Sequence, residues 1–175
     1  MNILLIILSI LFGFFVLLLI IAFFIKKEHF VKREIVIHAS RQKVYDYLKL
    51  LKNQDEFNDY AKRGEREKQF KGTDGTVGYV YAWKGDKSAG EGEKEIMNLI
   101  EGKRVEAEIR FIKPMKVSST VIMEMESFAD NQTKVSWSNS GKISYPFNLL
   151  IPMMEKGLPK DMDKSLSNLK LILEK

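Results

Sequence analysis

Three carboxylates at alternating positions have the clearest spacing for chemistry in this sequence. Glu91, Glu93 and Glu95 fall in one expected strand, where alternate side chains point to the same face. If that face lined a pocket, these carboxylates could act as general acids or bases. Because Met97 and Leu99 continue the same face, its direction is ambiguous unless a β-bulge changes it midway. Solvated carboxylates on an outer face are the better interpretation.

The remaining chemical groups form no recognisable catalytic or metal-binding motif. The only histidines, His29 and His38, lack a second histidine or a carboxylate at metal-ligand spacing. The chain has no cysteine, which excludes disulfides, thiolate catalysis and cysteine-based zinc sites. No nucleophile-elbow, phosphate-loop or zinc-hydrolase pattern is present. We therefore predict no catalytic residue, metal or cofactor; Tyr79, Tyr81, His38 and the Glu91 strand are the only candidates for acid–base work.

The N-terminal run has the length and composition of a membrane span. Residues 3–25 carry no charge, and only Ser9 and Gly13 interrupt the large apolar side chains. Such a run, at about 1.5 Å per residue, crosses a hydrocarbon core of ~30 Å. A secretory signal peptide is the alternative, but it would have basic residues first, a shorter apolar core and small residues at a cleavage site. We predict an uncleaved transmembrane anchor at 1–25.

The charges suggest how the rest of the chain meets the membrane. All 28 Lys and Arg and all 23 Asp and Glu follow the span, so the net charge of +5 belongs to the part outside it. This excess fits an anionic membrane surface, whereas mixed signs without a long basic block argue against nucleic acid. Basic residues occur just after the span and none before it, which predicts a single-pass cell-membrane protein with a cytoplasmic domain. The tether, residues 26–30, reaches at most about 18 Å.

Hydrophobic periodicity after the tether predicts one α+β domain at 31–175. Residues 30–39 alternate as a half-buried strand does, and Ser40 offers an N-cap for a short helix ending near Lys52. Phe57 and Tyr60 anchor a further helical turn and a loop. From residue 65 to about 144 the pattern has period two with short turns, including a hairpin turn at residues 84–87. These strands form an antiparallel meander that is apolar on one face and charged on the other. The strand after the turn at residues 72–76 presents Val77, Tyr79, Tyr81 and Trp83 on one side.

The chain closes with a helix that has one apolar stripe. Pro146 could start this helix, and Pro159 is expected to break or re-cap it. A helix with a single apolar stripe, following a sheet with a single apolar face, must bury the stripe on that face. The stripe consists of Met162, Leu166, Leu169 and Leu173. The dense run "PFNLLIPMM" could form a lid, dip into the bilayer beside the anchor, or pack on the sheet as the start of this helix.

The order of these elements resembles that of the START-like helix-grip superfamily, also called SRPBCC or polyketide-cyclase-like. "IVIHASRQKVYDYLKLLKN" is similar to the opening strand and helix of that family. "YAWKGDKSAGEGEKEI", "KRVEAEIRFIKPM" and "TKVSWSNSGKI" resemble its central hairpins, and "LPKDMDKSLSNLKLILEK" its final helix. The likeness covers nearly everything after residue 30. Relatives often carry Trp in the loop after the first helices, where this chain has Phe57 and Tyr60.

The resemblance implies a curved antiparallel sheet wrapped around a long C-terminal helix, with a cavity between them. Relatives use that cavity for lipids, sterols, polyketides or other apolar molecules, and a minority catalyse cyclisation or dehydration. We therefore expect a membrane-anchored domain that binds an apolar small molecule or lipid. The alternatives are a cyclase- or dehydratase-type enzyme and a membrane-localised protein-interaction module. The candidate cavity-lining residues, which could instead simply fill a core, are Tyr79, Tyr81, Trp83, Phe111, Met123, Met125, Trp137, Asn139 and Met162.

Overall fold

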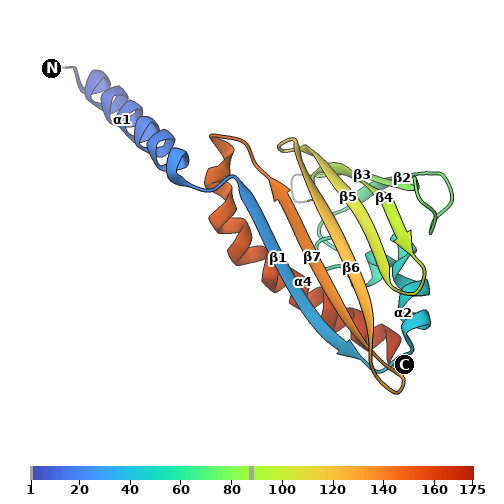
Figure 1. The fold of residues 1–175 in the computed structure, drawn as a ribbon. Coiled ribbons are helices and arrows are strands. Elements are labelled where there is room, and N and C mark those ends of the chain that lie inside the picture. The colour runs from blue at the N-terminus through green and yellow to red at the C-terminus, as the bar shows by residue number, and fades with distance from the viewer. Residues whose placement is uncertain (1, 87–88) are drawn as a thin grey trace.

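The computed structural model describes residues 2–86 and 89–175 and begins with a helix that stands away from the remainder (Figure 1). This helix, α1 (Ile3–Phe24), leaves most of its large apolar side chains exposed and buries only Ala22. Its length and composition suffice to cross a membrane, a property that signal sequences share. The N-terminal apolar helix expected from the sequence is therefore present.

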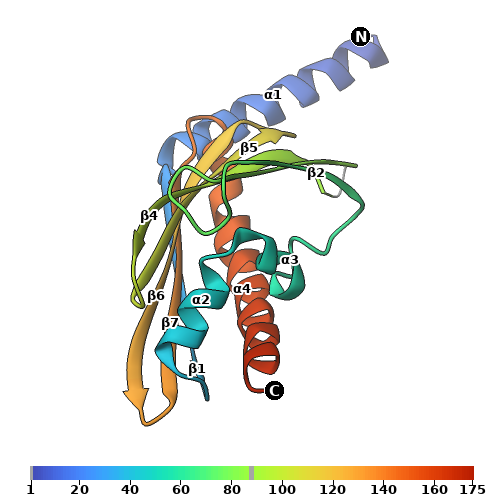
Figure 2. The same ribbon diagram turned by 90° about the vertical axis from the view of Figure 1, so that its right-hand side faces the viewer.

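Seven strands form one antiparallel sheet that curves around the C-terminal helix (Figures 1 and 2). The order across the sheet is β1-β7-β6-β5-β4-β3-β2, so six consecutive strands form the predicted meander and β1 pairs with the last of them. The strands are β1 (Glu28–Ile37), β2 (Arg66–Lys71), β3 (Val80–Gly85), β4 (Glu91–Ile100), β5 (Arg104–Lys113), β6 (Val117–Ala129) and β7 (Gln132–Lys142).

Short helices cover part of the inner face of the sheet, and one long helix crosses it (Figure 2). They are α2 (Arg41–Leu48), η1 (Leu51–Asn53), α3 (Gln54–Phe57), η2 (Phe147–Leu150) and α4 (Ile151–Leu173). The predicted cap is present, because the Ser40 hydroxyl accepts a hydrogen bond from the Lys43 amide. The helix that follows ends at Leu48 instead of near Lys52, because the chain turns into the separate 3₁₀ helix η1.

The strand register places the apolar residues on the helix-facing side of the sheet. Arg33 of β1 pairs with Trp137 of β7, which pairs with Met123 of β6. Residues directly opposite each other share a face, so the alternation read from the sequence describes one inner wall. The stripe of α4 lies against this wall with Met162, Leu166, Leu169 and Leu173 all buried. The helix-grip architecture is therefore confirmed.

Three local expectations were wrong. Pro159 does not interrupt α4, because Leu158 before it and Met162 after it pack on the core and hold the helix across the missing hydrogen bond. Val77 does not join the inner face, since β3 begins at Val80 and the Val77 side chain is exposed. The first strand begins at Glu28 and so includes most of the expected tether. The hairpin turn predicted at residues 84–87 lies partly outside the described residues.

Candidate functional site

The nine candidate residues all belong to the inner wall or to α4, and they fall into two hydrophobic clusters. Tyr79, Tyr81 and Trp83 belong to the β3–β4 cluster, together with Leu51 and Ile96. The other cluster, the α4 cluster, contains Met123, Met125, Trp137 and Met162. Phe111 packs at the border of the β3–β4 cluster and is half-buried, as is Asn139. Leu99 and Ile109 contact both clusters, so they mark the boundary between them.

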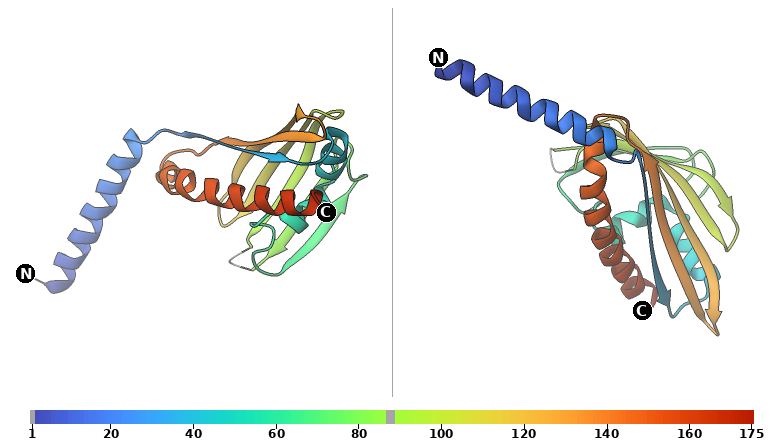
Figure 3. Two further views of the ribbon diagram at one scale, coloured as in Figure 1. Left: turned by 90° about the horizontal axis from the view of Figure 1, so that it is seen from below. Right: turned by 60° about the vertical axis from the view of Figure 1, so that its left-hand side comes forward.

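Different elements cover the two clusters. Helix α4 packs mainly along β1, at one edge of the sheet (Figure 3). The β3–β4 cluster instead contains Leu51 of η1. Phe57, the last residue of α3, contacts Trp137 edge-on at 6.3 Å, and Tyr60 in the loop that follows contacts Phe111 at 6.0 Å.

Lys94, which the sequence pattern did not mark as a site residue, is a lysine buried in this interior. It lies opposite Tyr81 on one neighbouring strand and Ile109 on the other. Its Nζ is 2.5 Å from Oε1 of Gln54, the first residue of α3. Burial lowers the pKa of Lys94 to about 7, because the charged amine loses its hydration. The available signal was the alternation, which places Lys94 on the same face as Ile96.

Two of the inner aromatic residues have their polar atoms satisfied by the protein. The Tyr81 hydroxyl donates to Oδ1 of Asp55 at 2.7 Å, and Lys68 pairs with the other oxygen of that carboxylate at 2.8 Å. Burial and the Asp55 carboxylate both raise the pKa of Tyr81. The Trp83 indole N–H donates to the Ala89 carbonyl at 3.2 Å. These contacts fix both rings in place.

Two further inner side chains have buried polar atoms without a hydrogen-bond partner among the described residues. They are the hydroxyl of Tyr79 in the β3–β4 cluster and the indole N–H of Trp137 in the α4 cluster. Burial raises the pKa of Tyr79 to about 12, so its hydroxyl remains protonated at neutral pH. An unmade hydrogen bond in an apolar interior is costly, and a bound polar atom would remove that cost.

The alternating carboxylates face outward, as the better interpretation of the sequence held. Arg110 binds both Glu93 and Glu95 on the outer face, at 2.7 and 2.5 Å. A register shift between Ile96 and Asn98 changes the facing midway along the strand, which is the bulge that the ambiguous pattern required. Among the described residues, no group of three or more His, Asp or Glu side chains could hold a metal ion.

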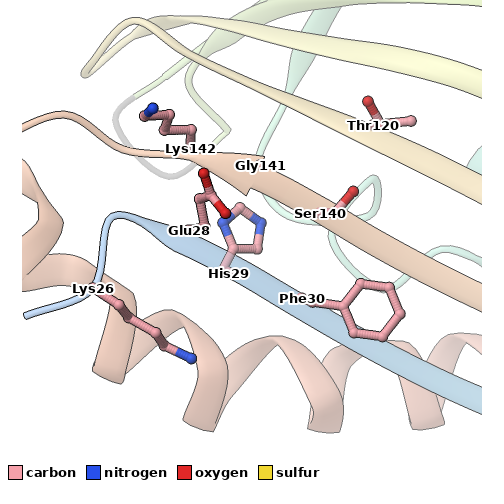
Figure 4. Close-up of a pocket in the computed structure, with 8 residues that line it drawn as sticks. All are labelled: Lys26, Glu28, His29, Phe30, Thr120, Ser140, Gly141 and Lys142. Atoms are coloured by element: carbon pink, nitrogen blue, oxygen red, sulfur yellow. The ribbon is translucent and has the colours of Figure 1, made fainter.

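A depression of about 510 Å³ lies near the end of α1 (Figure 4). The strand register places Phe30, Ser140 and Thr120 in one row of this region. The nearby His29 is buried and lies 2.8 Å from Oδ1 of Asn139 through Nε2. The lining residues are Lys26, Glu28, His29, Phe30, Thr120, Ser140, Gly141 and Lys142. None belongs to α4, so this depression is distinct from the predicted cavity, which remains a prediction.

Comparisons with known proteins identify the fold. No family profile matches the sequence, and no curated protein matches it. Among solved structures, truncated norcoclaurine synthase from Thalictrum flavum aligns with a TM-score of 0.65 at 13% identity, covering 85% of this chain and 95% of the other. The Aha1 dimer from Colwellia psychrerythraea gives 0.57 at 20% identity, with coverages of 83% and 96%. Ara h 8.0201 gives 0.61 at 12% identity, with coverages of 83% and 97%.

These similarities extend over nearly the whole of the matched chains. At such low identity they establish architecture and not activity. The chain therefore has the helix-grip fold, preceded by an apolar helix.

Proposed function

We propose that this protein is a membrane-anchored START-like domain that binds an apolar small molecule or lipid between its sheet and α4. The proposal includes a single membrane span at α1 and a domain on the cytoplasmic side, where Lys26 and Lys27 follow the span. A ligand dissolved in the bilayer would then need to cross little water.

The observation that carries the proposal is the pair of buried donors on the inner wall. The Tyr79 hydroxyl and the Trp137 indole N–H each lack a partner among the described residues, and they belong to different clusters. A molecule inserted at the boundary, beside Leu99 and Ile109, would meet apolar side chains from both clusters and these two donors. An apolar wall with a few polar groups is the usual composition of a ligand site.

The side chains of the two clusters must separate for such a molecule to enter. Helix α4 is the element best placed to move, since it packs mainly along β1 at one edge of the sheet. The sulfur-containing side chains of Met123, Met125 and Met162 can adapt to an inserted chain by changing rotamers. We therefore propose that ligand binding widens the space between α4 and the middle strands.

The two tryptophans provide a direct test, because both lie on the inner wall and the chain has no others. The full-length protein is placed in nanodiscs whose phospholipids carry bromine on the acyl chains, and tryptophan emission is compared with that in unbrominated discs. An acyl chain that enters the domain will quench Trp137 in the W83F variant and Trp83 in the W137F variant. The Y79F variant, which loses one donor, is expected to show weaker quenching.

One result would contradict lipid entry, and a second would contradict ligand binding altogether. Emission that is identical in brominated and unbrominated discs for both single-tryptophan variants means that no acyl chain reaches the interior. Mass spectrometry of the detergent-purified protein then checks for another bound apolar molecule. Absence of any co-purifying molecule, together with unquenched emission, would refute the proposed function.

Lys94 favours a second candidate, an enzyme of cyclase or dehydratase type. A buried amine whose pKa is about 7 can take up or release a proton near neutral pH. If Lys94 acts as the base, the K94M variant will retain the unconverted form of the molecule that the wild-type protein converts. Identical co-purified molecules in both proteins would exclude this role for Lys94.

A further inference from the structure

Asn148 joins the apolar helix α1 to the domain. This residue of η2 is fully buried, and its Nδ2 donates to the carbonyl oxygens of Ala22 at 2.6 Å and Ile25 at 2.7 Å. The last carbonyls of a helix have no partner within the helix, so an external donor is needed where they are buried. Asn148 provides this donor from a segment 126 residues away from Ala22 in sequence.

Two more contacts join the same parts. The Ile143 amide donates to the Lys27 carbonyl at 2.8 Å, and the Lys26 amine pairs with Glu155 of α4 at 2.7 Å. The end of α1 therefore lies against the segment between β7 and α4 (Figure 3). A tether alone would let the domain turn freely, whereas these contacts define one orientation of the domain relative to α1.

The same segment and the first turn of α4 expose large apolar side chains near the end of α1. Tyr145, Phe147, Leu150 and Met153, which we call the η2 patch, are exposed by 43%, 55%, 36% and 67%. Their neighbours Asn148 and Ile151 are fully buried, so the patch is the outer face of a well-packed turn. Figure 1 shows η2 and the start of α4 at the level where α1 ends, while the β6–β7 turn lies at the far end of the domain.

We propose that the η2 patch is a second membrane contact that inserts into the interface of an anionic bilayer, and that Asn148 holds it there by binding the end of the membrane span. The inference rests on the part of the proposed function in which α1 crosses the bilayer. The patch continues the apolar surface of α1 past its end. Basic residues are close to it in the chain or at the end of α1: Lys26 and Lys27 follow α1, Lys142 ends β7, and Lys26 and Lys142 line the same depression. Exposed apolar residues combined with basic ones are the composition of interfacial membrane segments.

The contact has a consequence for the ligand route. A domain held by both α1 and the η2 patch keeps the start of α4 at the membrane surface. The entrance proposed between α4 and the sheet would then have one fixed orientation relative to the headgroups, instead of sampling all directions. The η2 patch would thus orient the proposed lipid entrance toward the membrane, whichever lipid enters.

The absence of cysteine allows a clean depth measurement by spin labelling. Full-length F147C and M153C variants are labelled in nanodiscs of phosphatidylcholine and phosphatidylglycerol. Electron paramagnetic resonance then compares the access of oxygen, which concentrates in the bilayer, with that of a water-soluble nickel complex. The matched control is F128C, another exposed aromatic position at the far end of β6. We expect the labels at 147 and 153 to favour oxygen and the label at 128 to favour nickel.

Two additional variants separate this inference from the anchoring on which it rests. A label at I10C reports whether α1 lies in the bilayer. The N148A substitution removes the donor to Ala22 and Ile25, and we expect the M153C label to lose its preference for oxygen in that background. Unchanged thermal unfolding of N148A will show that the domain itself remains folded.

The outcomes are distinct. If the labels at 147 and 153 favour nickel while the label at 10 favours oxygen, the span exists and the η2 contact is wrong. If M153C keeps its depth in the N148A background, Asn148 does not hold the patch. If the label at 10 favours nickel, the membrane anchoring and this inference both fail, whatever the ligand experiment shows.

Discussion

The amine of Lys94 lies 2.5 Å from the amide oxygen of Gln54. This buried hydrogen bond connects strand β4 to the short helix α3. The residues on either side of Lys94 in the sequence are carboxylates that point outward to Arg110. A single basic group therefore faces inward from a strand whose acidic groups face outward. This arrangement makes Lys94 the most informative position for testing the interior of the domain.

Replacing Lys94 with Met is expected to change how stability depends on pH. Burial lowers the pKa of Lys94 from 10.5 to about 7. Between these values the unfolded chain binds a proton that the folded protein lacks, so this residue makes stability rise with pH across that range. The free energy of unfolding of the wild type, relative to K94M, should increase by roughly 2–4 kcal/mol from pH 7 to pH 10. Urea unfolding across that range measures this difference; parallel curves for the two proteins would contradict it.

Tyr81 of β3 and Tyr79, just before this strand, should respond differently to loss of the hydroxyl. Tyr81 donates to Asp55, so Y81F leaves a carboxylate with one partner fewer and should cost about 1–2 kcal/mol of stability. The hydroxyl of Tyr79 has no partner among the described residues, so Y79F should be neutral or slightly stabilising in ligand-free protein. Chemical unfolding of both variants under identical conditions tests the contrast. Equal losses of stability in the two variants would mean that the Tyr79 hydroxyl has a hydrogen-bond partner in solution.

Glycine at position 92 is expected to be required by the packing of Trp83. A Cβ added there would lie 2.6 Å from Cζ2 of Trp83 and 2.7 Å from the Arg110 carbonyl oxygen. The G92A variant should therefore lose about 1–3 kcal/mol of stability and shift the emission of Trp83.

The helical Gly157 provides the control for that experiment. Apart from the neighbouring residues and the backbone of its own helix, no described atom lies within 4 Å of a Cβ added at that position. The G157A variant should gain about 0.5–1 kcal/mol, because alanine loses less backbone entropy than glycine in a helix. A loss of stability in G157A would show that this face of α4 is covered by something else.

The outer-face cluster around Arg110 should contribute to stability in a salt-dependent way. Arg110 binds Glu93, Glu95 and Glu108 from three strand positions, and R110Q leaves these carboxylates to repel one another. We expect a loss of about 1 kcal/mol at low salt that shrinks at high salt, where the repulsion is screened. The K113Q variant, which breaks only the exposed pair with Glu91, should have little effect at either salt concentration. Equal effects of the two substitutions would contradict this assignment.

The periodic parts of the fold could be predicted from the sequence because burial on one side imposes a period. Alternation at Val105, Ala107 and Ile109 predicts one face of a strand, and the structure places these residues in that way. The stripe from Met162 to Leu173 predicts the buried side of the last helix. The bulge after Ile96 could be suspected only as an inconsistency in the alternation. The prediction that Pro159 breaks or re-caps the last helix was wrong, because packing of the flanking turns compensates for the missing hydrogen bond.

The sequence by itself determined the apolar helix, the order of strands and helices and the identity of the inner wall, since these depend on local hydrophobic pattern and chain connectivity. Only the tertiary structure decided which polar atoms in that wall have partners. Tyr79 and Tyr81 are equivalent by alternation, yet only Tyr81 meets a carboxylate, which comes from α3. Asn148 likewise acts on Ala22 from the other end of the chain. Hydrogen bonding and desolvation depend on three-dimensional neighbours, and no periodicity encodes neighbours so distant in sequence.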